Sequence, residues 1–125
     1  MTLLSQKDVD EIKAAMAELA PFTEEAITYR TFTGMTPGDP VHGTPEIPNY
    51  TDTSETAMTR NLTAEEVQTS GGAYVMGDME FTTRRTTKPE FEDRIVYGGL
   101  TWKPKKIDKM YLGEVLWWEV KAGRE

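Results

Sequence analysis

Three acidic residues close together, Glu90, Glu92 and Asp93, are the first candidates for chemistry in this chain. Carboxylate oxygens are the ligands that hard cations such as Ca²⁺ prefer. In an alternating strand Glu90 and Glu92 would share one face and Asp93 would point away, so only two carboxylates converge. We therefore expect a solvated strand start in which Asp93 bonds to a turn backbone, and we expect no metal and no cofactor.

Asp78 and Glu80 form a second acidic pair, which could act as general acid and base. Because Asp78 follows Gly77 at a tight turn, a conformational role is the simpler interpretation. The chain has no cysteine and one histidine, His42, which excludes thiol catalysis and zinc sites built from several histidines. We expect His42 to be an exposed loop residue, with a pH-sensitive latch as the alternative. Since no nucleophile and base pair stands out, we expect no enzyme activity.

Basic and aromatic residues are interleaved in the last third of the chain. The set comprises Arg84, Arg85, Lys88, Arg94, Lys103, Lys105, Lys106 and Lys109 with Tyr97, Trp102, Tyr111, Trp117 and Trp118. Such a set on a small barrel is typical of single-stranded nucleic-acid binding or of subunit contacts. The net charge of −7 favours subunit contacts. We predict Arg84, Arg85, Lys103 and Trp117 as interface residues. Trp117 is included because the alternation of a strand turns it outward if Trp118 faces the core.

The charge is spread unevenly along the chain. Residues 1–83 contain four basic and 14 acidic residues, whereas residues 84–125 contain ten basic and seven acidic residues. This asymmetry favours side-by-side or head-to-tail association of copies, with an ordinary solvated surface as the alternative. No basic segment followed by an apolar run opens the chain, and no apolar stretch is long enough to span a membrane, so we expect a cytosolic product without membrane contact.

The elements that must position these residues begin with one amphipathic helix over residues 5–20. Ser5 is its N-cap, apolar residues recur at three- and four-residue spacing, and Pro21 ends it. An alternating first strand follows at residues 25–33. Residues 34–56 contain four prolines and show no periodicity, which predicts a long irregular loop.

The remaining chain reads as short strands separated by turns. Thr63 begins a capping-box helical turn, and Gly98-Gly99 is a two-residue hairpin turn. Strands are expected at residues 57–62, 73–76, 79–85, 94–97, 100–105 and 115–122. The prediction is one domain, 1–125, of mainly β class: a small antiparallel β-barrel or sandwich over residues 25–122 with an N-terminal α-helix. Pro104 indicates an edge or bulged strand.

The order of these motifs resembles the head-closure and head-tail joining proteins of tailed bacteriophages. The resemblance rests on the opening strand ITYRTFTG and on Glu66, Gly71, Gly72, Gly77, Asp78, Asp93, Ile95, Tyr97, Gly98, Trp102, Ile107, Gly113 and Trp118. It covers most of residues 25–122. It implies a barrel that forms a homo-oligomeric ring, a dodecamer, at the phage neck between portal and tail. It also implies location in the virion after synthesis in the host bacterial cytoplasm.

The resemblance further implies partners and a role for the long loop. The ring would contact the portal or adaptor protein and a tail terminator or completion protein, and packaged DNA would pass through its channel without sequence-specific binding. The loop residues Pro37, Asp39, His42, Glu46 and Asp52 would form a channel gate, and the loop's charge of −4 would repel DNA. The alternatives are an adjacent tail-completion or tail-terminator ring, and a single-stranded nucleic-acid-binding barrel.

Overall fold

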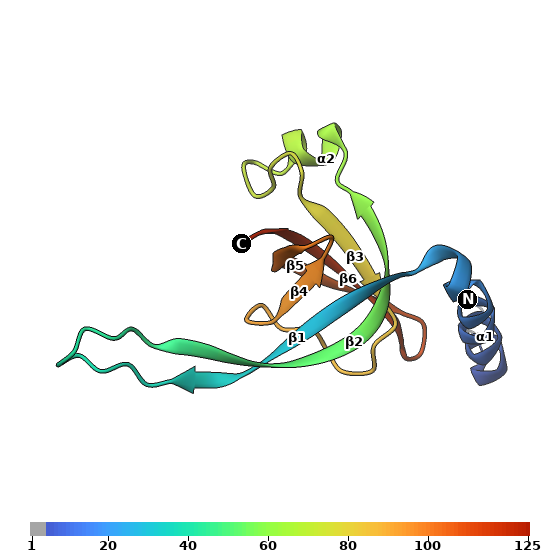
Figure 1. Ribbon diagram of the computed structural model, residues 1–125. Helices are drawn as coiled ribbons and strands as arrows, with labels where there is room; N and C mark the ends of the chain where they lie inside the picture. The colour runs from blue at the N-terminus through green and yellow to red at the C-terminus, as the bar shows by residue number, and fades with distance from the viewer. Residues whose placement is uncertain (1–4) are drawn as a thin grey trace.

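The computed structural model describes residues 5–125, apart from the side chains of residues 20–22. Two helices and six strands follow one another along the chain (Figure 1). They are α1 (Gln6–Thr23), β1 (Glu25–Thr36), β2 (Ile47–Asn61), α2 (Ala64–Thr69), β3 (Met79–Thr83), β4 (Arg94–Tyr97), β5 (Leu100–Tyr111) and β6 (Val115–Arg124).

The six strands close into a barrel in the order β1-β2-β3-β6-β5-β4, and every neighbouring pair is antiparallel. The predicted fold class is confirmed, and of the two predicted forms the chain adopts the barrel. Closure gives each strand a hydrogen-bonded neighbour on both sides over part of its length.

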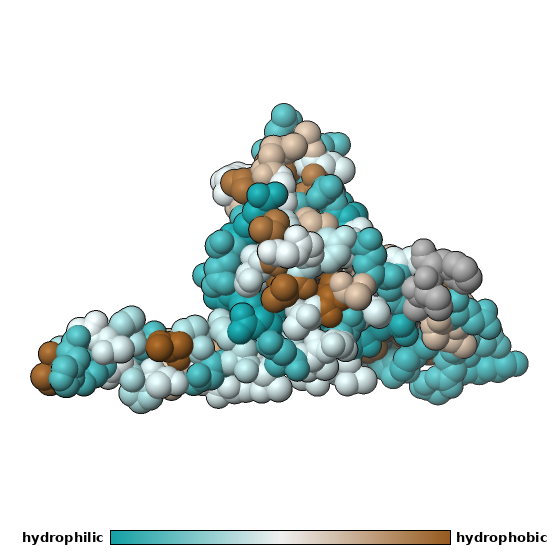
Figure 2. Space-filling view, in the orientation of Figure 1, coloured by the Kyte–Doolittle hydropathy of each residue, from teal (hydrophilic) through white to brown (hydrophobic). Residues whose placement is uncertain are grey.

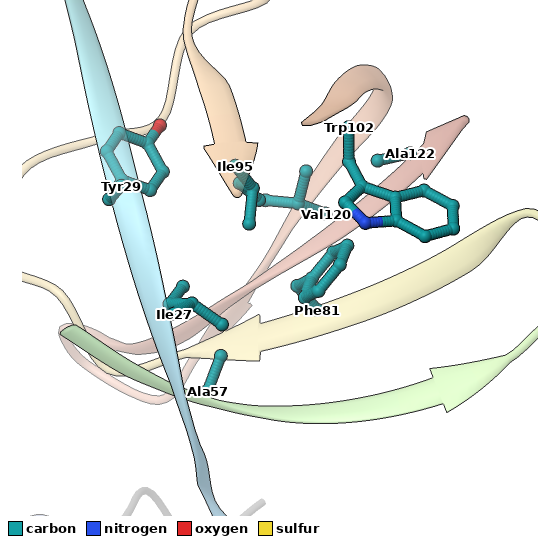
Figure 3. Packing of buried hydrophobic residues seen from close by; sticks show 8 residues of the cluster. All are labelled: Ile27, Tyr29, Ala57, Phe81, Ile95, Trp102, Val120 and Ala122. Carbon is teal, nitrogen blue, oxygen red and sulfur yellow. The ribbon is translucent and has the colours of Figure 1, made fainter. Parts of the chain in front are cut away.

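The barrel interior is filled by alternating side chains from all six strands (Figure 3). The cluster comprises Ile27, Tyr29, Ala57, Phe81, Ile95, Trp102, Val120 and Ala122. Phe81 meets Trp102 edge-to-face, with 6.0 Å between ring centroids. Along β6 the burial alternates from Leu116 onward, so the predicted inward face, which includes Trp118, is confirmed.

The helix α1 is longer than predicted. The Thr23 hydroxyl donates a hydrogen bond to the Leu19 carbonyl at 3.1 Å, and this bond supports one further turn beyond the expected end at Pro21. Few contacts hold α1 to the barrel. The Lys13 ammonium lies 3.3 Å from Glu114 in the turn between β5 and β6, and Val9 is buried.

Residues 34–56 are not an irregular loop, and this prediction was wrong. β1 and β2 pair continuously from Glu25↔Ala57 to Thr36↔Ile47, with one bulge between Phe32 and Gly34. Only residues 37–46 lie outside the two strands. Pro48 is tolerated in β2 because this part of the strand has no second neighbour that would need its missing N–H.

Three other local predictions have different outcomes. Residues 73–76 form turns and not a strand, because the Val75 amide bonds to the buried Asp78 carboxylate and its carbonyl accepts from the Asp78 amide. Pro104 lies at a register shift between β5 and β6, so the predicted bulge is confirmed. The Thr63 cap is also confirmed, since the Glu66 amide donates to its hydroxyl at 3.2 Å.

Candidate functional site

The most distinctive feature of the molecule is a two-stranded ribbon that projects from the barrel (Figure 1). β1 pairs with β4 only at Thr28–Arg30, and β2 pairs with β3 only at Met58–Asn61. Between these points the two strands pair with each other alone, and their far ends extend well beyond the barrel. The segment predicted as a channel gate, residues 34–56, therefore forms the outer part of this ribbon, which we call the arm.

Side-chain contacts stiffen the shaft of the ribbon. The Arg30 guanidinium donates to Asp52 at 3.0 Å and lies over the Tyr50 ring, 4.7 Å from its centroid. Phe32 meets the same ring edge-to-face at 6.0 Å. Of the predicted gate residues, Asp52 thus belongs to the shaft, where it is paired across the strands.

The ribbon tip, residues 37–46, carries the other four predicted gate residues, Pro37, Asp39, His42 and Glu46. Two backbone hydrogen bonds join Asp39 and Thr44, at 3.0 and 2.9 Å. The Asp39 carboxylate accepts from the amides of Val41 and His42 and from the His42 ring. The His42 hydrogen bond lowers the pKa of Asp39. His42 is exposed, as expected, and it contributes to a fixed tip.

Arg84 and Arg85, predicted as interface residues, line one open cleft of about 500 Å³ at the end of the barrel next to the ribbon. Arg84 is 2.9 Å from the Glu24 carboxylate. The Arg85 guanidinium stacks on Tyr29, 3.4 Å from the ring centroid, and only 10% of its side chain is exposed. Its Nε and Nη1 atoms have no hydrogen-bond partner among the described residues, since Glu55 stops 3.9 Å away.

The groove beside this cleft holds the predicted interface residue Trp117. The cleft and the groove share Glu24 and Arg84. The Trp117 indole N–H donates to Glu119 at 3.2 Å, and the ring is partly buried in the groove. Lys103 lies on β5 and lines neither hollow. The structure therefore brings three of the four predicted interface residues together.

The acidic candidates have structural partners. Residues 90–92 form a turn and not a strand, so the expected alternation was wrong. Asp93 is buried, where its carboxylate accepts from the Tyr29 hydroxyl at 2.6 Å, the Phe32 amide at 2.9 Å and the Glu90 amide at 3.0 Å. The last bond is the turn bond that the sequence predicted. Burial, together with the Asp93 bond, raises the pKa of Tyr29.

Asp78 is also buried and conformational in role. It accepts from the Val75 amide at 3.0 Å and from the Lys105 ammonium at 2.7 Å. Glu80 pairs with Arg60 at 3.2 Å and with Lys121 at 3.5 Å on the outer barrel wall. Neither the Tyr29–Asp93 contact nor the Lys105–Asp78 pair could be read from local patterns, because each joins residues far apart in the sequence.

Within residues 5–125, no set of three or more His, Cys, Asp or Glu side chains is placed to hold a metal ion. No helix in the same part of the chain is long and apolar enough to cross a membrane.

Comparisons with known proteins support the fold alone. No family model and no curated protein matches the chain. Among solved structures, the solution structure of protein SF1141 from Shigella flexneri 2a is similar to this chain, with a TM-score of 0.60 and 16% sequence identity. The match covers 82% of this chain and 92% of that protein. The likeness in fold therefore extends over most of both chains.

Proposed function

We propose that this protein is a structural component of the neck of a tailed bacteriophage, where copies form a ring that joins head to tail and closes the DNA channel. The observation that carries the proposal is a closed barrel with a stiff, acidic arm, in a chain whose motif order resembles head-closure proteins. A barrel supplies the wall of such a ring, and a projecting arm can line or narrow its channel.

The charge of the ribbon supports a channel role. Residues 31–59 contain no lysine or arginine and carry four acidic residues, Asp39, Glu46, Asp52 and Glu55. Sequence-independent DNA binding depends on lysine and arginine contacts to phosphates. Arg30, at the start of the shaft, is paired with Asp52 at 3.0 Å, so a lining of this kind does not grip DNA and the duplex can slide past it.

Burial of the aromatic residues argues against the single-stranded nucleic-acid alternative. Trp102 and Trp118 are 3% and 8% exposed, so neither offers a face on which a base can stack. Of the basic residues, Lys105 and Arg94 are held in ion pairs with Asp78 and Glu125. Four members of the interleaved set, Trp102, Trp118, Lys105 and Arg94, are thus used for the fold of the barrel.

The test removes the ribbon tip and leaves the barrel intact. Thr36 and Ile47 are register partners, so residues 37–46 can be replaced by the two-residue turn Asn-Gly. Phage particles carrying this variant should assemble but lose packaged DNA, measured as nuclease-sensitive genome and empty heads in electron micrographs. The control Val75→Asp, at an exposed side chain outside the ribbon, keeps the arm at full length and should retain its DNA.

Two results would contradict the proposal. One is absence of the protein from purified infectious virions, measured by mass spectrometry. The other is unchanged DNA retention in the shortened variant, provided that circular dichroism shows a folded barrel.

A further inference from the structure

An apolar groove lies between α1 and the outer surface of the barrel, with a volume of about 430 Å³. Its apolar wall is formed by Met16 and Leu19 of α1, Met58 of β2 and Trp117 of β6. Leu19 is 57% exposed and Met58 is 44% exposed, so the single chain leaves this wall largely uncovered. Contiguous apolar surface of this kind marks an interaction site.

The ribbon tip offers a matching apolar surface. Val41 is 85% exposed at the end of the arm, and Ile47 and Met35 behind it are 52% and 46% exposed. Figure 2 shows apolar atoms at the far end of the ribbon, surrounded by hydrophilic ones. Burying side chains of this type against a partner removes them from water and lowers the free energy of the complex.

The tip is also fixed in shape before any contact. The Asp39–Thr44 bridge closes it, and the Asp39 carboxylate holds the amides of Val41 and His42. A Cβ on Gly38 would lie 2.4 Å from the Thr44 carbonyl oxygen, so the two sides of the tip are packed tightly. A preformed tip loses little conformational entropy on binding.

Charge indicates how the tip would be oriented on the groove. The tip carries Asp39 and Glu46 and no basic residue other than His42. The cleft that adjoins the groove contains Arg84, which pairs with Glu24 at 2.9 Å, and Arg85, whose Nε and Nη1 atoms have no hydrogen-bond partner among the described residues and which lies 3.9 Å from Glu55. Carboxylates beside these arginines would pair opposite charges across the contact.

The positions of tip and groove decide between contact within one copy and contact between copies. In Figure 1 the ribbon tip and α1 lie at opposite ends of the molecule. A tip therefore cannot reach the groove of its own chain. Two different complementary surfaces on one molecule produce a head-to-tail contact, which closes into a ring when the rotation between copies allows it.

We propose that the ribbon tip of each copy seats in the groove of the next copy, with Val41 against the apolar wall and the tip carboxylates beside Arg84 and Arg85. Closure of these contacts into a ring rests on the proposed function. In that ring the ribbon shafts line the channel and the tips seat on neighbouring copies. The pairwise contact itself depends only on the surfaces described above.

Because the chain has no cysteine, a pair of introduced cysteines tests the contact directly. In the full chain carrying Val41→Cys and Leu19→Cys, oxidation should produce a ladder of covalent multimers on non-reducing gels. The matched control is Val41→Cys with Val75→Cys, since Val75 is 57% exposed and lines neither the groove nor the arginine cleft. We expect about tenfold more multimer from the first pair than from the second.

A second measurement avoids cross-linking. Val41→Asp places a charge on an exposed side chain, so the barrel should fold normally, and self-association measured by sedimentation should weaken about tenfold or more. Val75→Asp is the matched control and should associate like the unaltered chain.

Several outcomes would overturn the inference. They are equal ladders from both cysteine pairs, no multimer at any protein concentration, or a tip cysteine that couples to a different neck protein and never to a second copy. If these occur while the protein is present in virions, only this inference fails. If the ladder forms but virions lack the protein, the proposed function fails and the contact between copies stands.

Discussion

Replacing Asp93 by alanine should destabilise the whole barrel, because one buried carboxylate joins three parts of the chain. It accepts from the Tyr29 hydroxyl inside the barrel, the Phe32 amide at the root of the ribbon and the Glu90 amide in the preceding turn. Tyr29 is fully buried, so its hydroxyl would have no solvent to replace the lost bond.

The magnitude follows from the burial of each donor. A hydrogen bond to a charged group contributes about 1.5–3 kcal/mol, and the Tyr29 bond should be worth about 2 kcal/mol in this range. The partly buried Phe32 amide adds about 1–2 kcal/mol, whereas water can replace the bond to the exposed Glu90. The free energy of unfolding should therefore fall by about 3–4 kcal/mol in Asp93→Ala.

Urea unfolding followed by tryptophan fluorescence measures this loss. At a slope of about 2 kcal/mol per molar urea, the midpoint should fall by about 1.5–2 M. Glu92→Ala is the matched control, since it removes a neighbouring but exposed carboxylate and should change stability by less than about 0.5 kcal/mol. Tyr29→Phe combined with Asp93→Ala should cost less than the sum of the single variants. A loss below about 1 kcal/mol in Asp93→Ala, or one equal to the control, would refute the reasoning.

Two further predictions concern the ribbon tip. Gly38→Ala should open the tip, because the added Cβ would lie within 3 Å of backbone atoms of Thr44, Pro45 and Glu46. Amide hydrogen exchange should rise for residues 37–46 only, and faster exchange in the barrel would contradict the local effect. His42→Ala should raise the pKa of Asp39 toward its ordinary value, because the hydrogen bond that lowers it is lost, and an NMR titration of the carboxyl carbon measures this. Because folding lowers the pKa of Asp39, the contribution of its carboxylate to tip order is present above the ordinary aspartate pKa and is lost as pH falls through the folded pKa. An unchanged Asp39 titration in His42→Ala would disprove the role of the bond.

The parts of the fold that could be predicted from sequence have local causes. The alternation of β6, the Thr63 cap and the Gly98-Gly99 turn each depend on residues a few positions apart. The ribbon was missed for the converse reason. Pro37, Pro40, Pro45 and Pro48 suggest irregular backbone, but the first three lie in the tip, outside the two strands. Pro48 lies in β2, where the strand pairs with β1 alone, so it breaks no ladder bond at the free edge.

The candidate site was predictable in composition and not in arrangement. The interleaving of basic and aromatic residues predicts Arg84, Arg85 and Trp117 as interface residues, and closure of the barrel places them in two adjoining hollows. Lys103 carries the same local signal but lies on β5, away from both hollows. The difference depends on strand order, which no short sequence pattern records.

Residues at the point where the ribbon leaves the barrel connect the arginine cleft to the ribbon. Tyr29 of β1 lies between the Arg85 guanidinium, 3.4 Å from its ring centroid, and the Asp93 carboxylate, 2.6 Å from its hydroxyl. Asp93 in turn holds the Phe32 amide, where the ribbon leaves the barrel. A contact that moves Arg85 in the cleft therefore changes the surroundings of the residues that set the direction of the ribbon. One chain of contacts, from Arg85 through Tyr29 and Asp93 to the Phe32 amide, therefore joins the cleft to the point where the arm leaves the barrel.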